Sequence, residues 1–288
     1  MLAFLSGQAE EITIKHNGLT LNANLTMAEG NHFSAGMVLV MHGVLGHNRM
    51  EVVEAAQQAL LDIGFSSLAM NLSLSIDNRH GFLDCDVDHQ HIQDDVLDEV
   101  GAWIDYLNSQ GANRIVLMGH GFGANQILAY VQDRPDPIIT HLIFLAPNTT
   151  STFGDAHLRR YGQSADATLN KAKQLIEEGR GHELMANTDF LFCPRAQVSP
   201  NSFVSYYSVE KVEQYFDFPR FLSSTDIPSL VTTGAADERQ PQVAKQIFPY
   251  VDGKKIQLTV IEDAGHFFHD FNIDKAMKSV VDFLAEAR

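Results

Sequence analysis

The stretch that decides the fold is GHGFG at residues 119–123, which joins the apolar run RIVLM at 114–118 to the helical pattern ANQILAY at 124–130. An apolar run, a glycine-rich turn and a helical pattern in this order predict a strand that turns sharply into a helix and holds its middle residue at the bend. That middle residue is Gly121, which has no side chain. The motif therefore indicates a reactive bend without a reactive group.

Strand and helix patterns alternate along most of the chain. Segments 11–16 and 19–26 flank Asn17-Gly18, which predicts an antiparallel hairpin. Mostly unbroken apolar runs, typical of strands buried on both faces of a parallel sheet, follow at 36–41, 66–74, 114–119, 138–146, 229–234 and 255–262. Helical patterns occupy 51–64, 94–111, 124–133, 240–251 and 274–287. The predicted fold class is α/β, a doubly wound, mainly parallel sheet with an N-terminal antiparallel hairpin.

One segment interrupts this alternation. Residues 148–226 combine helical patterns with irregular stretches rich in Ser, Pro and Phe, without a clear parallel strand. An insertion here would lie over the carboxyl edge of the sheet, where ligands bind in this architecture. We therefore expect a core domain of residues 1–147 and 227–288 and a cap of residues 148–226. Its aromatic side chains could line an apolar pocket, although packing of the cap is the simpler role for each: Phe190, Phe192, Phe203, Tyr206, Tyr207, Tyr215, Phe216, Phe218 and Phe221.

Composition limits the partners. The formal charge of −16 argues against nucleic acid and an anionic membrane, and favours an uncharged or cationic small-molecule substrate. Cys85 and Cys193 lie far apart in the sequence and outside any CxxC pair, so we interpret both as thiols. No signal-peptide pattern or membrane span is recognisable, which predicts a soluble, cytoplasmic protein. No cofactor is indicated, and a homodimer is left open.

Three further turns follow predicted strands. HGVLG at 42–46 comes after the first parallel strand, GAADE at 234–238 places Asp237 after the fifth, and EDAGHFFHD at 262–270 places His266 after the last. Together with GHGFG these motifs match, in order and spacing, the α/β-hydrolase fold: oxyanion turn, nucleophile elbow, cap, acid and histidine. The chain resembles that family from about residue 11 onward.

The resemblance implies a role for each motif. His266 would be the general base, and Asp237 would fix its tautomer and stabilise the imidazolium. The backbone amides of Val44 and Phe122 would form the oxyanion hole. Gly121 occupies the nucleophile position, where the family pattern requires Ser, Asp or Cys. The substrate implied is a small molecule with an acyl group.

Several other polar residues compete for roles. Glu238 and Asp263 are rivals of Asp237 for the acid, although Asp237 has the better spacing after the strand. Four residues are candidates for substrate binding: His42, Arg79, His80 and His120. Of these, His120 precedes the elbow residue and is expected to be structural.

The segment 77–95 is dense in His and carboxylate side chains, which are ligands that zinc or manganese uses. Its spacing matches no metal motif, and Asp94 and Asp95 open a predicted helix, where carboxylates complement the helix dipole. We therefore predict no metal. The segment is instead expected to wall the active-site entrance, with Arg79 or His80 touching substrate.

Glycine at the nucleophile position leaves three interpretations open. The natural protein could carry Ser at position 121, making this chain an inactivated variant of an ester or thioester hydrolase. Gly121 could instead be native, in a binding protein that uses the pocket without catalysis. Third, His266 could activate a water for direct attack, because the oxyanion hole and substrate binding alone leave about 10³–10⁴-fold acceleration in triad-deficient enzymes.

Overall fold

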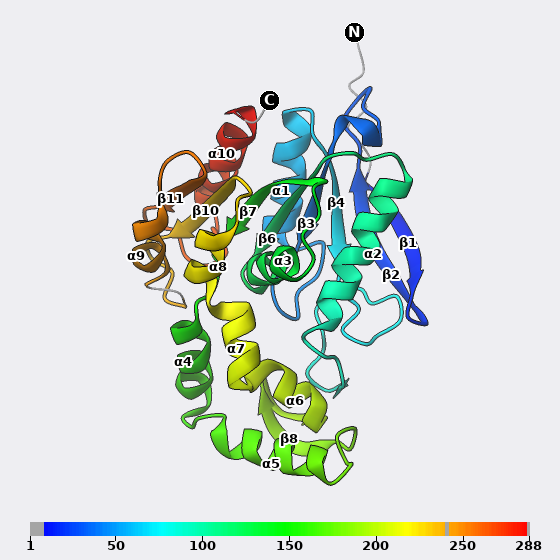
Figure 1. Ribbon diagram of the computed structural model, residues 1–288, viewed down its shortest axis with the longest axis vertical. Helices are drawn as coiled ribbons and strands as arrows, with labels where there is room; N and C mark the ends of the chain where they lie inside the picture. The colour runs from blue at the N-terminus through cyan, green and yellow to red at the C-terminus, as the bar shows by residue number, and fades with distance from the viewer. Residues whose placement is uncertain (1–8, 240–241, 287–288) are drawn as a thin grey trace.

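A computed structural model describes residues 9–239 and 242–286 of the chain. Its centre is an eight-stranded sheet in the order β1-β2-β4-β3-β6-β7-β10-β11 (Figure 1). β1 (Glu10–His16) and β2 (Leu19–Thr26) pair antiparallel, and Asn17 and Gly18 between them both have positive φ, as a two-residue type I′ turn requires. The predicted hairpin is confirmed.

The remaining strands make the sheet mainly parallel, as predicted. Only the β2–β4 contact is antiparallel beyond the hairpin, and each later neighbour in the sheet pairs parallel. Every residue of β3, β4, β6 and β10 is buried, which explains their unbroken apolar runs. The bounds are β3 (Met37–Met41), β4 (Ser66–Asn71), β6 (Ile115–His120), β7 (Ile139–Leu145), β10 (Ser229–Gly234) and β11 (Ile256–Ile261).

Helices cover both faces of the sheet and form two hydrophobic cores. On one face Leu39 of β3 packs with residues of α2 (Asp95–Ser109) and α3 (Phe122–Asp133). On the other face its neighbour Val40 packs with α1 (Glu51–Asp62) and α10 (Phe271–Glu286). Successive strand residues point to opposite faces, so this split is what a doubly wound sheet requires.

The helix expected at 240–251 is shorter than predicted. α9 (Val243–Ile247) passes directly into a 3₁₀ turn, η2 (Phe248–Tyr250). Pro249 has no backbone N–H to continue the α-helical hydrogen bonds, which accounts for the change. Residues 240 and 241 lie outside the described residues. None of the described helices combines the length and the apolar character that a membrane crossing needs.

The chain between β7 and β10, here called the inserted segment (residues 146–228), extends away from one end of the sheet (Figure 1). It contains a hairpin, β8–β9, that the sequence pattern missed, because charged or polar residues alternate irregularly with the buried ones. Its elements are α4 (Thr150–Tyr161), α5 (Asp166–Glu177), β8 (Met185–Phe190), β9 (Cys193–Val198), α6 (Pro200–Tyr207), α7 (Val209–Phe216) and α8 (Phe218–Ser224).

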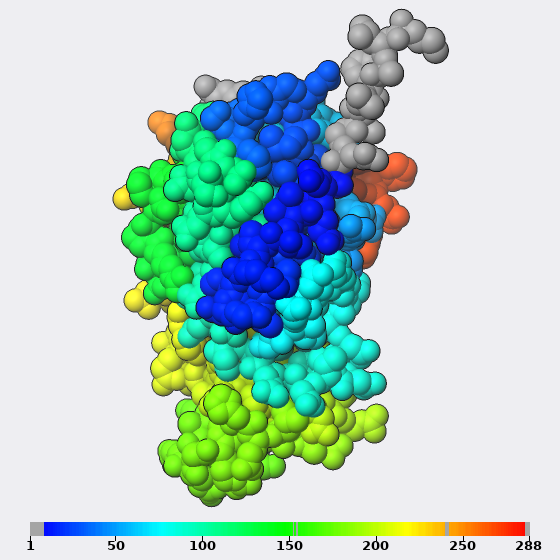
Figure 2. Space-filling model, turned by 90° about the vertical axis from the view of Figure 1, so that its right-hand side faces the viewer, coloured from blue at the N-terminus to red at the C-terminus, as the bar shows by residue number. Residues whose placement is uncertain are grey.

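The loop of residues 72–94, which connects β4 to α2, contacts the inserted segment. Its short strand β5 (Asp88–His89) pairs parallel with β9, so a parallel strand pair does occur at the inserted segment. Figure 2 shows the cyan surface of this part of the chain directly above the green surface of the inserted segment.

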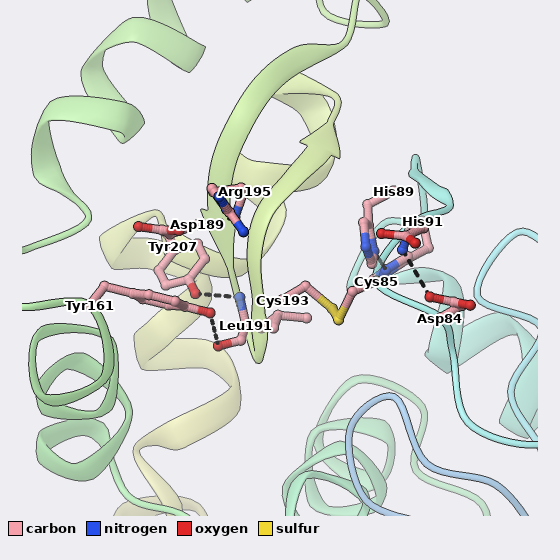
Figure 3. The surroundings of a disulfide bond; sticks show 11 residues. Asp84, Cys85, His89, His91, Tyr161, Asp189, Leu191, Cys193, Arg195 and Tyr207 are labelled. Atoms are coloured by element: carbon pink, nitrogen blue, oxygen red, sulfur yellow. Dashed lines mark hydrogen bonds between the residues drawn. A yellow bond between two sulfur atoms is a disulfide. The ribbon is translucent and has the colours of Figure 1, made fainter.

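Cys85 and Cys193 form a disulfide between this loop and β9, with an S–S distance of 2.09 Å (Figure 3). The interpretation of both as thiols was wrong. The two residues are 108 positions apart, and only the β5–β9 pairing, which the sequence did not reveal, brings them together.

Candidate active site

The GHGFG turn forms a sharp bend between β6 and α3. β6 ends at His120, α3 begins at Phe122, and Gly121 between them has φ 56° and ψ −122°. The flanking glycines are required by close packing, because a Cβ on Gly119 would come within 2.5 Å of the Gly123 backbone and one on Gly123 within 2.3 Å of the His42 carbonyl oxygen. The sequence therefore keeps both glycines that a tight strand-to-helix bend needs.

The loops after β10 and β11 bring an acid and a histidine together. Oδ2 of Asp237 lies 2.9 Å from Nδ1 of His266. Because a carboxylate only accepts hydrogen bonds, Nδ1 carries the proton, and Nε2 of the neutral ring is left as the acceptor. The other oxygen of Asp237 accepts the backbone N–H of Arg239 at 2.9 Å. Asp237 is almost fully buried, so this carboxylate holds the imidazole in one orientation.

The free nitrogen of His266 faces the bend. A Cβ atom on Gly121 would lie 3.1 Å from Nε2 of His266 and 3.9 Å from the Cα of Gly43. A hydroxyl carried by that Cβ would therefore lie within reach of the base. Neither rival acid takes the place of Asp237: Glu238 is exposed at the cleft, and Asp263 is an exposed turn residue with φ 61°.

The two predicted oxyanion residues both line the same cleft. Val44 belongs to a turn after β3 closed by the Gly46 N–H to Gly43 carbonyl hydrogen bond of 3.1 Å. Phe122 is the first residue of α3, where the N–H groups have no partner within the helix and the helix dipole is positive. This end of α3 suits a developing negative charge on a carbonyl oxygen.

A cleft of about 700 Å³ opens over the carboxyl ends of the strands, between the sheet and the inserted segment. Gly121, His266 and the two predicted oxyanion residues line it, as do Phe82, Leu83 and Cys85 of the 72–94 loop. That loop therefore does wall the cleft. Among the aromatic residues singled out in the sequence, Phe192 and Tyr207 line the cleft, whereas Phe190, Phe203, Tyr206, Tyr215, Phe216 and Phe218 are buried in the packing.

Arg79 and His80 do not line the cleft, so the structure does not support the contact with substrate expected for either of them. Arg79 is buried, and its guanidinium donates to the Leu72 carbonyl at 2.7 Å and to Asn71 Oδ1 at 2.8 Å, which holds the loop in shape. His80 lies on the outer surface, where its Nε2 is 2.9 Å from a carboxylate oxygen of Glu11.

His42, another candidate for substrate binding, is held in the interior of the protein. Its ring is fully buried and does not line the cleft. Nε2 accepts the Leu72 N–H at 3.1 Å, and Nδ1 donates to the Gly43 carbonyl at 2.6 Å. Burial lowers the pKa of His42 to about 3, so the ring stays neutral and fastens the oxyanion turn to the neighbouring loop.

His120 both lines the cleft and supports the base. Its Nε2–H donates to the backbone carbonyl of His266 at 2.9 Å, and the two ring centroids are 5.0 Å apart. Burial lowers the pKa of His120 to about 3. The neutral ring of His120 therefore positions His266 without placing a positive charge beside it.

Side chains of the His- and Asp-rich loop form hydrogen bonds and an ion pair with residues of the inserted segment. His91 Nδ1 lies 2.9 Å from the Tyr206 hydroxyl, and Asp94 accepts from Tyr215 at 2.8 Å and pairs with Lys211. In the part of the chain that the structure describes, no group of three or more His, Cys, Asp or Glu side chains is placed to hold a metal ion.

Three arginines of the cleft were missed in the sequence. Arg159 and Arg160 come from α4, and Arg239 follows the acid loop. The sequence did offer two signals. Arg159 and Arg160 are adjacent basic residues in a strongly acidic chain, and Arg239 follows Asp237 by two residues.

Part of the chain matches a known protein family. Residues 29–167, just under half of the chain, match a family model described as "Protein of unknown function (DUF3530)". A search of curated protein sequences finds no match.

Solved structures resemble nearly the whole chain. Est1E from Butyrivibrio proteoclasticus with bound ferulic acid is 20% identical with a TM-score of 0.68, covering 96% of this chain and 98% of its own. Dienelactone hydrolase from Anabaena variabilis is 13% identical with a TM-score of 0.61, covering 98% of each chain. Alpha/beta hydrolase domain-containing protein 10 from mouse is 12% identical with a TM-score of 0.62, covering 97% of this chain and 100% of its own. At these identities the likeness carries the fold alone.

Proposed function

We propose that this chain, which has the α/β-hydrolase fold, carries the site of a carboxylic-ester or thioester hydrolase in which Gly121 stands at the nucleophile position. The observation that carries the proposal is the 3.1 Å distance between the Cβ position of Gly121 and Nε2 of His266. Asp237 holds the other nitrogen of the same ring. Base, acid and bend thus have the relative placement that acyl transfer needs.

The chemistry follows from these positions. With a hydroxyl at residue 121, Nε2 of His266 would accept its proton as the oxygen attacks the acyl carbon. The imidazolium, stabilised by Asp237, would then return the proton to the leaving group. The amides of Val44 and Phe122 would stabilise the negative charge that develops on the carbonyl oxygen. The inserted segment acts as a cap that encloses the acyl group in this proposal.

Glycine removes the covalent step but leaves the base in place. The direct route for this chain is a water that donates a proton to Nε2 of His266 while its oxygen attacks the acyl carbon. The imidazolium then returns that proton to the leaving alcohol or thiol as its bond to the acyl carbon breaks. Residue 121 presents no side chain between Nε2 and the cleft, which favours this route as the second candidate. A third candidate, binding without turnover, uses the same cleft.

The test compares Gly121→Ser with Gly121→Ala on short acyl esters and thioesters. The proposal expects the Ser variant to hydrolyse them at least about 10³-fold faster than the Ala variant and to be labelled by a fluorophosphonate probe. Gly121→Ala is the matched control, because it carries the Cβ without the hydroxyl. A folded Ser variant with neither activity nor labelling would overturn the proposal.

The unaltered chain separates the other two candidates. Slow hydrolysis that disappears in His266→Ala supports water activation, whereas equal rates in the two proteins refute it. A ligand that co-purifies in the cleft and is recovered unchanged supports binding without turnover.

The disulfide changes the expected compartment. Disulfides persist in oxidising compartments and are rare in the cytosol, where thiols are kept reduced. The Cys85–Cys193 bond therefore favours an oxidising compartment over the cytoplasm that we expected from the sequence. Titration of free thiols in protein isolated from its native cells without reductant tests this: two reactive thiols per chain would support the cytoplasm.

A further inference from the structure

The cleft has a charge opposite to that of the whole chain. The chain carries a formal charge of −16, yet Arg159, Arg160 and Arg239 line the cleft, and Glu238 is the one acidic residue in its described lining. Arg159 has a partner on its own helix, Asp155 at 3.8 Å. Arg160 and Arg239 form no ion pair with any described residue. Two cations that form no ion pair with a described carboxylate therefore lie at the cleft of an acidic protein.

These two arginines lie over one aromatic ring. Cζ of Arg160 is 4.2 Å from the centroid of the Phe192 ring, and Cζ of Arg239 is 5.8 Å from it. Partial shielding from water and the charge of Arg160 lower the pKa of Arg239. Each guanidinium is attracted to the face of the ring, whereas the two positive charges repel each other. The charge of Asp237 offsets part of this repulsion at Arg239. An anion between them would relieve that repulsion and accept charge-assisted hydrogen bonds from both.

The hairpin tip that carries the Phe192 ring is held in place by three contacts of the residues next to Phe192. Phe192 is at the tip of the β8–β9 hairpin, next to Leu191, whose carbonyl accepts from the Tyr161 hydroxyl at 3.3 Å and whose N–H donates to the Tyr207 hydroxyl at 2.9 Å (Figure 3). On the other side of Phe192, Cys193 is tied to Cys85. The tip is thus fixed, so the two arginines are presented at a defined point of the cleft.

That point lies close to the reacting centre. Cζ of Arg239 is 4.8 Å from the centroid of Phe267, and the Phe267 and His266 rings are 5.1 Å apart. Arg239 and His266 therefore both lie against the same aromatic ring, that of Phe267. A substrate whose carbonyl lies at the bend would reach the arginines with a chain of a few atoms.

We propose that Arg160 and Arg239, which both lie over the Phe192 ring, form a subsite for a negatively charged group, a carboxylate or a phosphate, carried by the substrate a few bonds from the carbonyl that is attacked. The subsite rests on the proposed function and names its substrate class. The net charge of the chain had favoured an uncharged or cationic substrate, but the local lining of the cleft decides what binds there. The acidic exterior would repel anions at long range, and the two arginines select them at the site.

The experiment measures binding by calorimetry to the unaltered chain with three anilides of equal length. Glutaric acid monoanilide ends in a carboxylate, 4-phosphonobutyric acid anilide ends in a phosphonate, and pentananilide ends in a methyl group. At least one of the two anionic probes is expected to bind about tenfold or more tightly than pentananilide. The anionic probe that binds better identifies the source of the charge, and the preference should weaken as salt is raised.

Variants separate charge from packing. Arg160→Gln and Arg239→Gln should each remove most of the anion preference, and Arg160→Lys should retain part of it. Arg220→Gln is the matched control, because Arg220 lies over Phe221 at 5.5 Å on α8, outside the cleft lining, and this change should leave the preference intact.

Equal binding of all three anilides, or a preference that survives in both Arg→Gln variants, would overturn the subsite. Because anilide binding requires no turnover, this outcome is independent of whether Gly121→Ser becomes an esterase. Hydrolysis of neutral esters by that variant without any anion preference would leave the proposed function standing and the subsite refuted.

Discussion

A Cβ atom on Gly121 would lie 3.1 Å from Nε2 of His266, and this relationship between the two residues defines the candidate site. The bend keeps the φ of 56° that is strained for residues with a side chain. Glycine at residue 121 therefore allows this bend without the strain that a side chain would add. Substitutions at this turn can therefore lower the free energy of unfolding in two separate ways, through strain of the backbone or through steric overlap with neighbouring atoms.

The first prediction contrasts two glycines of the turn. Gly121→Ala should lower the free energy of unfolding by about 1–3 kcal/mol, the cost of a side chain at a sparsely populated φ and ψ. The tight contact of its Cβ is the one of 3.1 Å with Nε2 of His266, whose ring can shift by a few tenths of an ångström, whereas Gly43 Cα at 3.9 Å is in ordinary van der Waals contact. Gly123→Ala should cost about 3 kcal/mol or more, because its Cβ would meet backbone oxygens of His42 and Met41.

Urea denaturation of the two variants checks this order. Gly121→Ser should match Gly121→Ala in stability, since both have the same backbone cost, so any difference in hydrolysis between them reports the hydroxyl. A Gly123→Ala protein as stable as Gly121→Ala would contradict the packing of α3 against the oxyanion turn.

The sheet and the contact between Asp237 and His266 could be predicted from the sequence for a physical reason. Strands buried on both faces must be apolar throughout, and the turns at their carboxyl ends must meet at one edge of the sheet. Asp237 and His266 are 29 positions apart in the chain, yet each follows a predicted strand, so their meeting could be expected.

Features that depend on contacts without a periodic pattern could not be predicted. The β8–β9 hairpin has short strands with mixed burial, and without it neither the disulfide nor the place of Phe192 can be inferred. Arg79 lies in a polar run like that of a binding loop, but its guanidinium turns inward to backbone carbonyls. The direction of a long side chain in an irregular loop is set by such local hydrogen bonds, which a sequence pattern does not encode.

The second prediction concerns the Cys85–Cys193 bond. Removing it with Cys85→Ser and Cys193→Ser together should lower the free energy of unfolding by about 2–5 kcal/mol, because the bond closes a long loop in the unfolded chain. Cys85 lines the cleft and Cys193 follows the Phe192 tip, so the affinity for anionic anilides should also fall. Reductant should reproduce both effects in the unaltered chain and leave the double variant unchanged. If fully reduced protein, verified by thiol titration, unfolds at the same urea concentration as oxidised protein, the prediction is wrong.

The third prediction is a loss of stability on acidification. Burial lowers the pKa values of His42, His91 and His120 to about 3, whereas an unfolded histidine titrates near 6.5. Between these values the unfolded chain binds protons that the native protein excludes. Each histidine therefore contributes stability that is fully present above pH 6.5 and is lost as pH falls towards 3, with a slope of up to about 1.4 kcal/mol per pH unit.

Glu99 acts in the opposite direction. Burial raises its pKa from 4.5 to about 7, so from pH 4.5 to 7 the native protein binds more protons there than the unfolded chain does. Its contribution to stability is therefore largest at low pH and is lost as pH rises through about 7. Three histidines outweigh one glutamate, and the net free energy of unfolding should decrease from pH 6.5 to pH 5.

Two variants isolate these contributions in urea titrations across that pH range. His91→Gln, which is remote from the bend, should make the dependence on pH shallower by up to about 1.4 kcal/mol per pH unit. Glu99→Gln keeps an oxygen for the Ser73 N–H, a bond of 2.9 Å in the structure, and should make the dependence steeper. A chain whose stability is constant from pH 6.5 to pH 5, or a His91→Gln variant with an unchanged slope, would show that these buried rings do take up protons in the native protein.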